Sequence, residues 1–95
     1  AGRNLSLVPP TPVRDSDPDY SENARRAKIS GMVTVLADVG ADGCVYQEKV
    51  LKSLDRELDE ASLDAVSQWK FKPATKAGIA IPVRVKIDVD FRIFD

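Results

Sequence analysis

With 95 residues, 14 of them basic and 15 acidic, the chain is long enough for one domain with a small core and carries almost no net charge. Its basic residues alternate with acidic ones, and its aromatic residues are only 3 Phe, 2 Tyr and 1 Trp, which argues against a nucleic-acid-binding face. No apolar run approaches the length that spans a membrane, and we find no signal peptide. A single cysteine excludes an internal disulfide.

The first 13 residues predict a linker end. Pro9, Pro10 and Pro12 favour an extended polyproline conformation and remove backbone donors. The same stretch also suits a spacer between this domain and whatever precedes it. We therefore expect a proline-containing linker end at residues 1–13 and a folded domain at residues 14–95.

A short helix is expected after Tyr20. Ser21 can cap its N-terminus, and Glu22 places an acid in the first turn, where the helix dipole favours one. Ala24 and Ala27 offer a narrow apolar face, and Gly31 is expected to end the helix. About two turns of helix are not stable alone, so packing must hold them.

A β-hairpin is predicted next. In residues 32–39, Val33, Val35, Ala37 and Val39 alternate on one side of a strand. Residues 40–43 contain the Asp-Gly pair typical of hairpin turns. Residues 44–53 return as the second strand, in which Cys44 is expected as a small strand residue.

A second helix is predicted before the tryptophan. Asp55 or Asp59 can cap it, and its apolar face is formed at three- and four-residue steps by Leu58, Ala61 or Ser62, Ala65 or Val66, and Trp69. We expect Trp69 and Phe71 near the junction of helix and sheet, with Trp69 mostly buried. Pro73 is expected to end the helix, and residues 75–78 to turn the chain.

The last strand alternates without a break over residues 83–93. Its apolar side carries Val83, Val85, Ile87, Val89, Phe91 and Ile93, and its polar side carries Arg84, Lys86, Asp88, Asp90 and Arg92. Such a strand has one face on a core and one in water. A helical crossover then predicts an α+β fold with a three-stranded antiparallel sheet of order 2-1-3 and two helices on one face. The last strand is therefore an edge.

Several motifs, in order, resemble the C-terminal domain of TonB-family energy transducers. The resemblance covers about residues 12–94 and is carried by Asp17-Pro18-Asp19-Tyr20-Ser21-Glu22-Asn23-Ala24-Arg25, Gly31-Met32-Val33, Asp42-Gly43-Cys44-Val45, Leu58-Asp59-Glu60-Ala61, Ala65-Val66, Trp69-Lys70-Phe71-Lys72-Pro73-Ala74 and Val89-Asp90-Phe91. Asp17 stands where the best-known members have Gln, and Ser21 where they have a second Pro. An acidic Asp17 and Asp19 would suit a basic transporter surface.

The resemblance implies a periplasmic domain whose full-length protein is anchored in the inner membrane. Such a domain binds the N-terminal box of outer-membrane receptors by β-strand addition, and couples the proton motive force of inner-membrane motor proteins to transport, including siderophore uptake. The expected partner-binding residues are Val83, Arg84, Val85, Lys86, Ile87, Asp88, Val89, Asp90, Asp17 and Tyr20, and the expected core residues are Trp69, Phe71 and Phe91.

Two further alternatives stay open at this point. The domain could serve a structural or sensory role, TonB-like or TolA-like, fused to another membrane protein, which the sequence upstream of Ala1 would reveal. The last strand could also pair with a second copy, giving a strand-exchanged dimer instead of a monomer, or with the chain's own residues 5–8. We expect no enzyme activity, cofactor or metal, because histidine is absent and Asp88 and Asp90 suit a solvated mixed-charge face.

Overall fold

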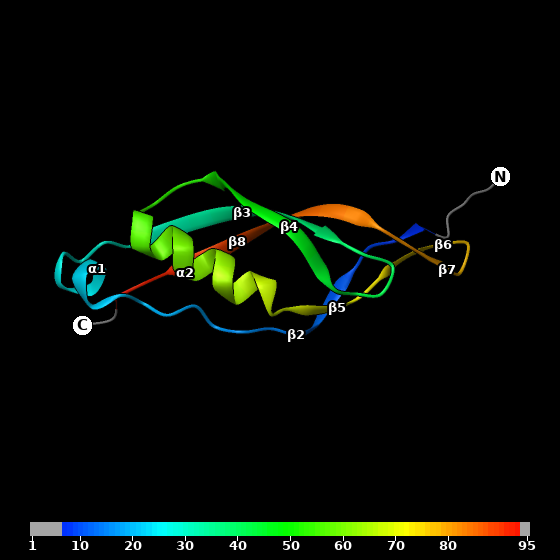
Figure 1. Cartoon of the computed structure of the whole chain (residues 1–95), viewed down its shortest axis with the longest axis horizontal. Coiled ribbons are helices and arrows are strands. Elements are labelled where there is room, and N and C mark those ends of the chain that lie inside the picture. The colour runs from blue at the N-terminus through cyan, green and yellow to red at the C-terminus, as the bar shows by residue number, and fades with distance from the viewer. Residues whose placement is uncertain (1–6, 94–95) are drawn as a thin grey trace.

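The structure is a computed structural model that describes residues 7–93, in an elongated shape of 54 × 23 × 21 Å. Figure 1 shows a central sheet covered by a helix, with a narrower β-extension, formed by residues 70–81, at one end of the molecule. In chain order the elements are β1 (Leu7–Val8), β2 (Thr11–Arg14), α1 (Glu22–Arg26), β3 (Gly31–Val39), β4 (Val45–Lys52), α2 (Arg56–Ser67), β5 (Lys70–Lys72), β6 (Ala74–Lys76), β7 (Ile79–Ile81) and β8 (Val83–Phe91).

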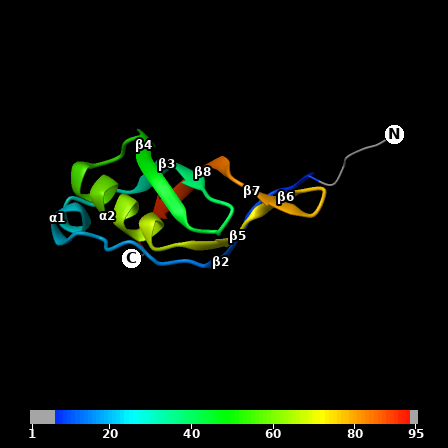
Figure 2. The same ribbon diagram turned by 45° about the vertical axis from the view of Figure 1, so that its right-hand side comes forward.

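The central sheet has the order β4-β3-β8, and both pairings are antiparallel. This confirms the predicted 2-1-3 order and the α+β class. Helix α2 packs against β3 and β4 on one face of the sheet, and α1 lies near the N-terminal end of α2 (Figures 1 and 2). Within residues 7–93, no helix is long and apolar enough to cross a membrane.

The core follows the predicted alternation of β3. Val33, Val35, Ala37 and Val39 are fully buried, whereas Met32, on the opposite face, is 42% exposed. From other elements, the core receives Ala24, Leu58, Val66, Val89 and Phe91. Phe91, expected as a core residue, is 2% exposed.

Burial rises along β8 from its start to its end. Val83, Val85 and Ile87 are half-buried on the inner face, whereas Val89 and Phe91 are buried. Helix α2 packs on β3 and β4, so it does not cover the first half of β8. An apolar row therefore stays partly exposed beside this edge.

Helix α1 is capped as predicted but ends earlier. The Ser21 Oγ accepts a hydrogen bond from the Ala24 N–H at 3.1 Å. Gly31 does not end the helix, so that prediction was wrong. Lys28 adopts a left-handed φ of 57°, and its N–H and that of Ile29 donate to the carbonyls of Arg25 and Ala24. This is a Schellman motif in which lysine takes the place usually held by glycine.

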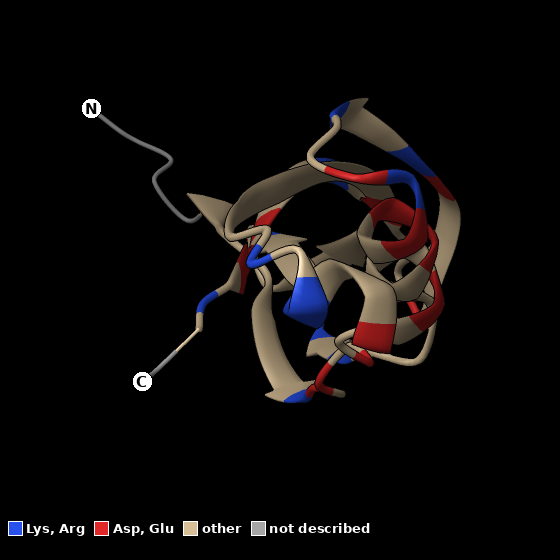
Figure 3. Ribbon diagram, turned by 90° about the vertical axis from the view of Figure 1, so that its left-hand side faces the viewer, with Lys and Arg blue, Asp and Glu red and all other residues tan. Residues whose placement is uncertain are grey.

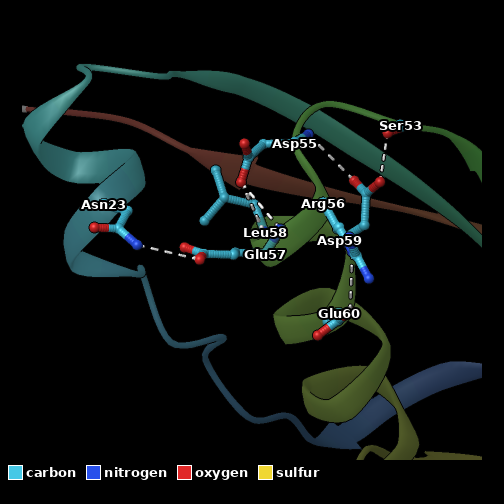
Figure 4. Close-up of polar contacts among 8 residues, drawn as sticks. All are labelled: Asn23, Ser53, Asp55, Arg56, Glu57, Leu58, Asp59 and Glu60. Atoms are coloured by element: carbon cyan, nitrogen blue, oxygen red, sulfur yellow. Dashed lines mark hydrogen bonds and ion pairs between the residues drawn. The ribbon is translucent and has the colours of Figure 1, made fainter.

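The structure decides between the two candidate caps of α2. The Asp55 carboxylate accepts from the N–H groups of Glu57 and Leu58 at 3.1 and 3.2 Å, so Asp55 is the cap. Asp59 instead points back. It accepts from the Ser53 hydroxyl, as Figure 4 shows, and it also accepts from the Leu54 N–H. The two aspartates together fix the entry of the chain into the helix.

The end of α2 corrects the sequence prediction. The helix stops at Ser67, Trp69 follows it, and Lys70–Lys72 form β5, so Pro73 does not terminate a helix. The Phe71 N–H donates to the Gly43 carbonyl at 2.8 Å, which supplies a partner that a helix would otherwise provide. Phe71 is 6% exposed, and Trp69 is partly buried against the core, so both lie at the junction of helix and sheet.

Residues 7–14, which we call the N-terminal strap, pair with the β-extension. Strand β1 pairs with β6, and β2 pairs with β5, both antiparallel. The alternative in which residues 5–8 pair with the last strand is wrong for Leu7 and Val8, which pair with β6, and Leu5 and Ser6 lie outside the described residues. The boundary between linker and domain near residue 14 stays a prediction, although the stretch before it is held by strand pairing.

Trp69→Ala should destabilise the domain strongly. The indole Nε1–H donates to the Ser16 carbonyl at 3.1 Å, and the ring packs on Phe71 with centroids 6.0 Å apart. Truncating a large aromatic in a core costs roughly 3–5 kcal/mol, and this half-buried site falls toward the lower end. The melting temperature should drop by more than about 10 °C. Trp69→Phe, which keeps a ring, should cost less, and an unchanged melting temperature in Trp69→Ala would refute this role.

Gly43→Ala should destabilise the domain more than Gly78→Ala. Both glycines have a left-handed φ, +84° and +80°, so each alanine costs about 1 kcal/mol of backbone strain. A Cβ at Gly43 would also lie 2.1 Å from the Phe71 carbonyl oxygen, whereas nothing lies within 4 Å of one at Gly78. Thermal unfolding of both variants tests this, and equal losses would show that the β3–β4 turn does not need its close contact with β5.

Candidate functional site

The open edge of β8 is the candidate site. Strand β8 pairs with β3 in unbroken register from Gly31↔Phe91 to Val39↔Val83. Within residues 7–93, β8 has no strand on its other side. It is therefore an edge strand of nine residues without a bulge.

The opposite edge of the sheet differs. The pairing of β4 with β3 shifts register between Thr34 and Val35 and again between Leu36 and Asp38. Gln47 in β4 has a left-handed φ of 52°. Bulges twist an edge and interrupt its row of donors and acceptors. Of the two edges of the central sheet within residues 7–93, β8 alone is regular.

The hydrogen bonds of Gly40 identify the free backbone groups of β8. The Gly40 N–H donates to the Cys44 carbonyl, and its carbonyl accepts from the Gly43 N–H, so both of its groups face the β4 side. Backbone groups alternate sides along a regular strand, so the even residues of β3 face β4 and the odd ones face β8. Odd residues of β8 therefore bond to β3, and the free edge belongs to Arg84, Lys86, Asp88 and Asp90.

The side chains of these four residues form the outer face. Arg84 Nε donates to Asp38 Oδ1 at 2.8 Å, and this bond raises the pKa of Arg84. The Thr34 hydroxyl donates to Asp88 at 2.7 Å, and Arg92 pairs with Asp90 at 3.2 Å. Lys86 makes no ion pair within residues 7–93. Figure 3 shows basic and acidic residues interspersed over the ribbon.

The structure brings Asp17 and Tyr20 to the far end of β8. The Tyr20 ring meets Phe91 edge to face, with centroids 5.3 Å apart, and its hydroxyl donates to the Ile29 carbonyl. The Arg25 guanidinium lies 5.4 Å from the Tyr20 ring centroid. Asp17, Tyr20 and Asp90 line a hollow of about 330 Å³. The predicted binding residues thus follow one edge and its end, and Tyr20 also fixes α1 against β8.

Sequence reasoning missed the contacts of the β3–β4 turn. Lys70 Nζ lies 2.9 Å from Cys44 Sγ, which raises the pKa of the lysine. The Tyr46 hydroxyl donates to Asp42 Oδ2 at 2.5 Å. No local pattern links residues 26 positions apart, and the spacing of Asp42 and Tyr46 is informative only once the turn is known. Within residues 7–93, no cluster of three or more acidic or cysteine side chains could hold a metal ion.

The tyrosine of this turn gives a pH-dependent prediction. The hydrogen bond to Asp42 raises the pKa of Tyr46 from 10.0 to about 12, and the same bond lowers the pKa of Asp42. The folded pKa of Tyr46 is raised and that of Asp42 is lowered from 3.8, so the contribution of this bond to stability is fully present between about pH 4 and pH 10. The contribution is lost as the pH rises through about 12, and also as the pH falls through the lowered pKa of Asp42.

Asp42→Asn should move the titration of Tyr46 back toward pH 10, because the carboxylate partner is gone. Ultraviolet absorbance of the phenolate measures it, and Tyr46→Phe assigns the step. A midpoint that stays near 12 in Asp42→Asn would show that the carboxylate is not the cause.

Comparison with known proteins places the chain in a family. Residues 16–93 match the family model described as Gram-negative bacterial TonB protein C-terminal. The chain belongs to this family. Proteins of the family are transport energy transducers and not enzymes, and this chain is a TonB-like periplasmic domain.

Several relatives support this assignment. Protein TonB of Xanthomonas campestris pv. campestris (strain B100) is 39% identical over 77 residues, which cover 80% of this chain and 34% of the relative. Protein TonB of Vibrio cholerae serotype O1 is 32% identical over 77 residues, which cover 80% of this chain and 32% of the relative. The chain spans about a third of the length of these relatives.

The fold agrees with a solved TonB domain. The solution NMR structure of the Pseudomonas aeruginosa TonB CTD matches with a TM-score of 0.75 and 28% identity, over 90% of this chain and 88% of that one. The family model begins at residue 16, so the N-terminal strap lies outside it.

Proposed function

We propose that this domain binds an extended segment of an outer-membrane TonB-dependent transporter by adding it as a strand to β8. The observation that carries the proposal is the regular free edge of β8, in contrast to the opposite edge, β4, which two register shifts interrupt. Strand addition needs backbone donors and acceptors in a row, with alternate side chains for selectivity.

The length of the edge sets the length of the partner segment. The free groups of Arg84, Lys86, Asp88 and Asp90 span roughly 20 Å at about 3.3 Å per residue, so a segment of about seven residues can pair with all of them. A short peptide loses conformational freedom on binding, so its affinity should be weak. Asp17, at the far end of the edge, would face basic groups on the transporter.

The wider role extends beyond this chain. The full-length protein would be anchored in the inner membrane and would engage proton-driven motor proteins there. The domain would transmit the energy that these motor proteins supply to a transporter during the uptake of substrates, siderophores included. The pairing of the N-terminal strap with β5 and β6 supports this, because tension on the chain before residue 7 would load the β-extension first.

Lys86→Pro should abolish binding of a transporter-box peptide. Proline removes the free N–H of residue 86 but no hydrogen bond to β3, so the loss of stability should be modest. Lys86→Ala is the matched control, because it removes the charge and keeps the N–H; its affinity should stay within a few fold. Amide shift mapping on the intact chain reports where the peptide binds.

Two results would refute the proposal. One is unchanged peptide affinity in Lys86→Pro. The other is a set of perturbed amides on β4 or the helices while residues 83–93 stay unchanged.

A further inference from the structure

An apolar hollow lies at the start of β8. Backbone pairing of an added strand with β8 does not by itself involve this hollow. Its volume is about 280 Å³, and it is lined by Leu7, Val8, Pro9 and Pro10 of the N-terminal strap, by Ala74, and by residues 83–85. Leu7 is 65% exposed although it forms one wall. The strap residues lie outside the region that the family model matches.

The hollow is continuous with the edge that the proposed function uses. Val83 and Val85 point to the inner face of β8 and are only half-buried, because α2 packs elsewhere. A strand added to β8 places every second side chain on this same face, beside Val83 and Val85. One of those side chains would therefore lie over the hollow.

The charges on the outer face of β8 give a second basis for selecting the partner segment. Arg84 and Lys86, at this end, are basic, whereas Asp88 and Asp90, at the far end, are acidic. Asp38 already pairs with Arg84, but Lys86 has no ion-pair partner within residues 7–93. The residue next to the one over the hollow projects to this outer face, where an acid would pair with Lys86 across the strands.

We propose that the hollow is an anchor site for one branched aliphatic side chain of the segment added to β8, with an acidic residue next to it in the partner sequence. The inference rests on the proposed function, since it needs the added strand. The N-terminal strap then selects among transporters by completing the wall of the anchor site.

The test uses the intact 95-residue chain and synthetic peptides. The host is an acetylated peptide of nine residues, alternating threonine and serine, with a guest pair near either end, so that the guest is its only aliphatic anchor. The guest pairs are Leu-Glu, Ala-Glu and Leu-Gln, and affinity is measured from the amide shifts of β8. Each methylene group that enters the hollow should tighten binding by up to roughly fourfold. Leu-Glu should therefore bind roughly tenfold tighter than Ala-Glu, and a few fold tighter than Leu-Gln.

The double variant Leu7→Ala, Val8→Ala removes two walls of the hollow. It should reduce the preference for Leu-Glu over Ala-Glu to about twofold or less, while the shifts on β8 persist. Val13→Ala is the matched control, since Val13 lies in the same strap, is also 65% exposed and does not line the hollow. It should keep the full preference. Circular dichroism melting confirms that both variants fold.

Three outcomes overturn the inference, and they differ in whether the proposed strand addition to β8 is overturned with it. Equal affinity for leucine and alanine guests, with β8 shifts present, removes the anchor site and leaves strand addition intact. Tighter binding by the double variant would mean that the strap competes with the peptide instead of supporting it. Failure of every peptide to perturb β8 would overturn the proposed function together with the anchor site.

Discussion

The alternation of residues along β3 is the constraint on which the rest of the structure depends. Its odd residues fill the core with Val33, Val35, Ala37 and Val39, and their backbone groups bond to β8. Its even residues carry the solvent face and bond to β4. A slip of one residue would expose the core face and exchange the two sets of backbone partners. The same alternation therefore fixes the core, the position of α2 and the set of free groups on β8.

A second constraint ties the β-extension to this sheet. The Gly43 carbonyl accepts from the Phe71 N–H, and the β3–β4 turn comes so close to β5 that a side chain at position 43 would collide with its backbone. Strand β5 in turn holds β2 of the strap. The strap, β5 and the hairpin turn thus form one connected unit, which links the N-terminal end of the chain to the sheet that carries the candidate site.

The sequence was sufficient where structure depends on local periodicity. The alternation of residues 32–39 and 83–91 predicted two strands and their buried faces, the helical crossover predicted the edge position of the last one, and Ser21 was correctly placed as a cap. The sequence was insufficient where contacts with residues far away in the chain determine the local structure. Residues 70–72 continue a helical pattern, yet they form a strand because Gly43 and β2 satisfy their backbone groups. The prolines of the strap likewise predicted an unpaired linker, and Leu7 and Val8 gave no local sign of pairing with β6.

The candidate site was predictable as an edge, but its selectivity was not. A regular, nine-residue edge invites uncontrolled pairing, and charges on one face discourage it without blocking the backbone row. On β8 these charges come from the same residues whose backbone groups are free. A partner strand must therefore pair with the backbone groups and complement the side-chain charges at the same time. The apolar row on the other face becomes selective only where the strap and Ala74 close around Val83 and Val85. The strap part of that wall comes from residues more than seventy positions away, which is why periodicity alone could not reveal it, and why a change in the strap can alter partner choice without touching β8.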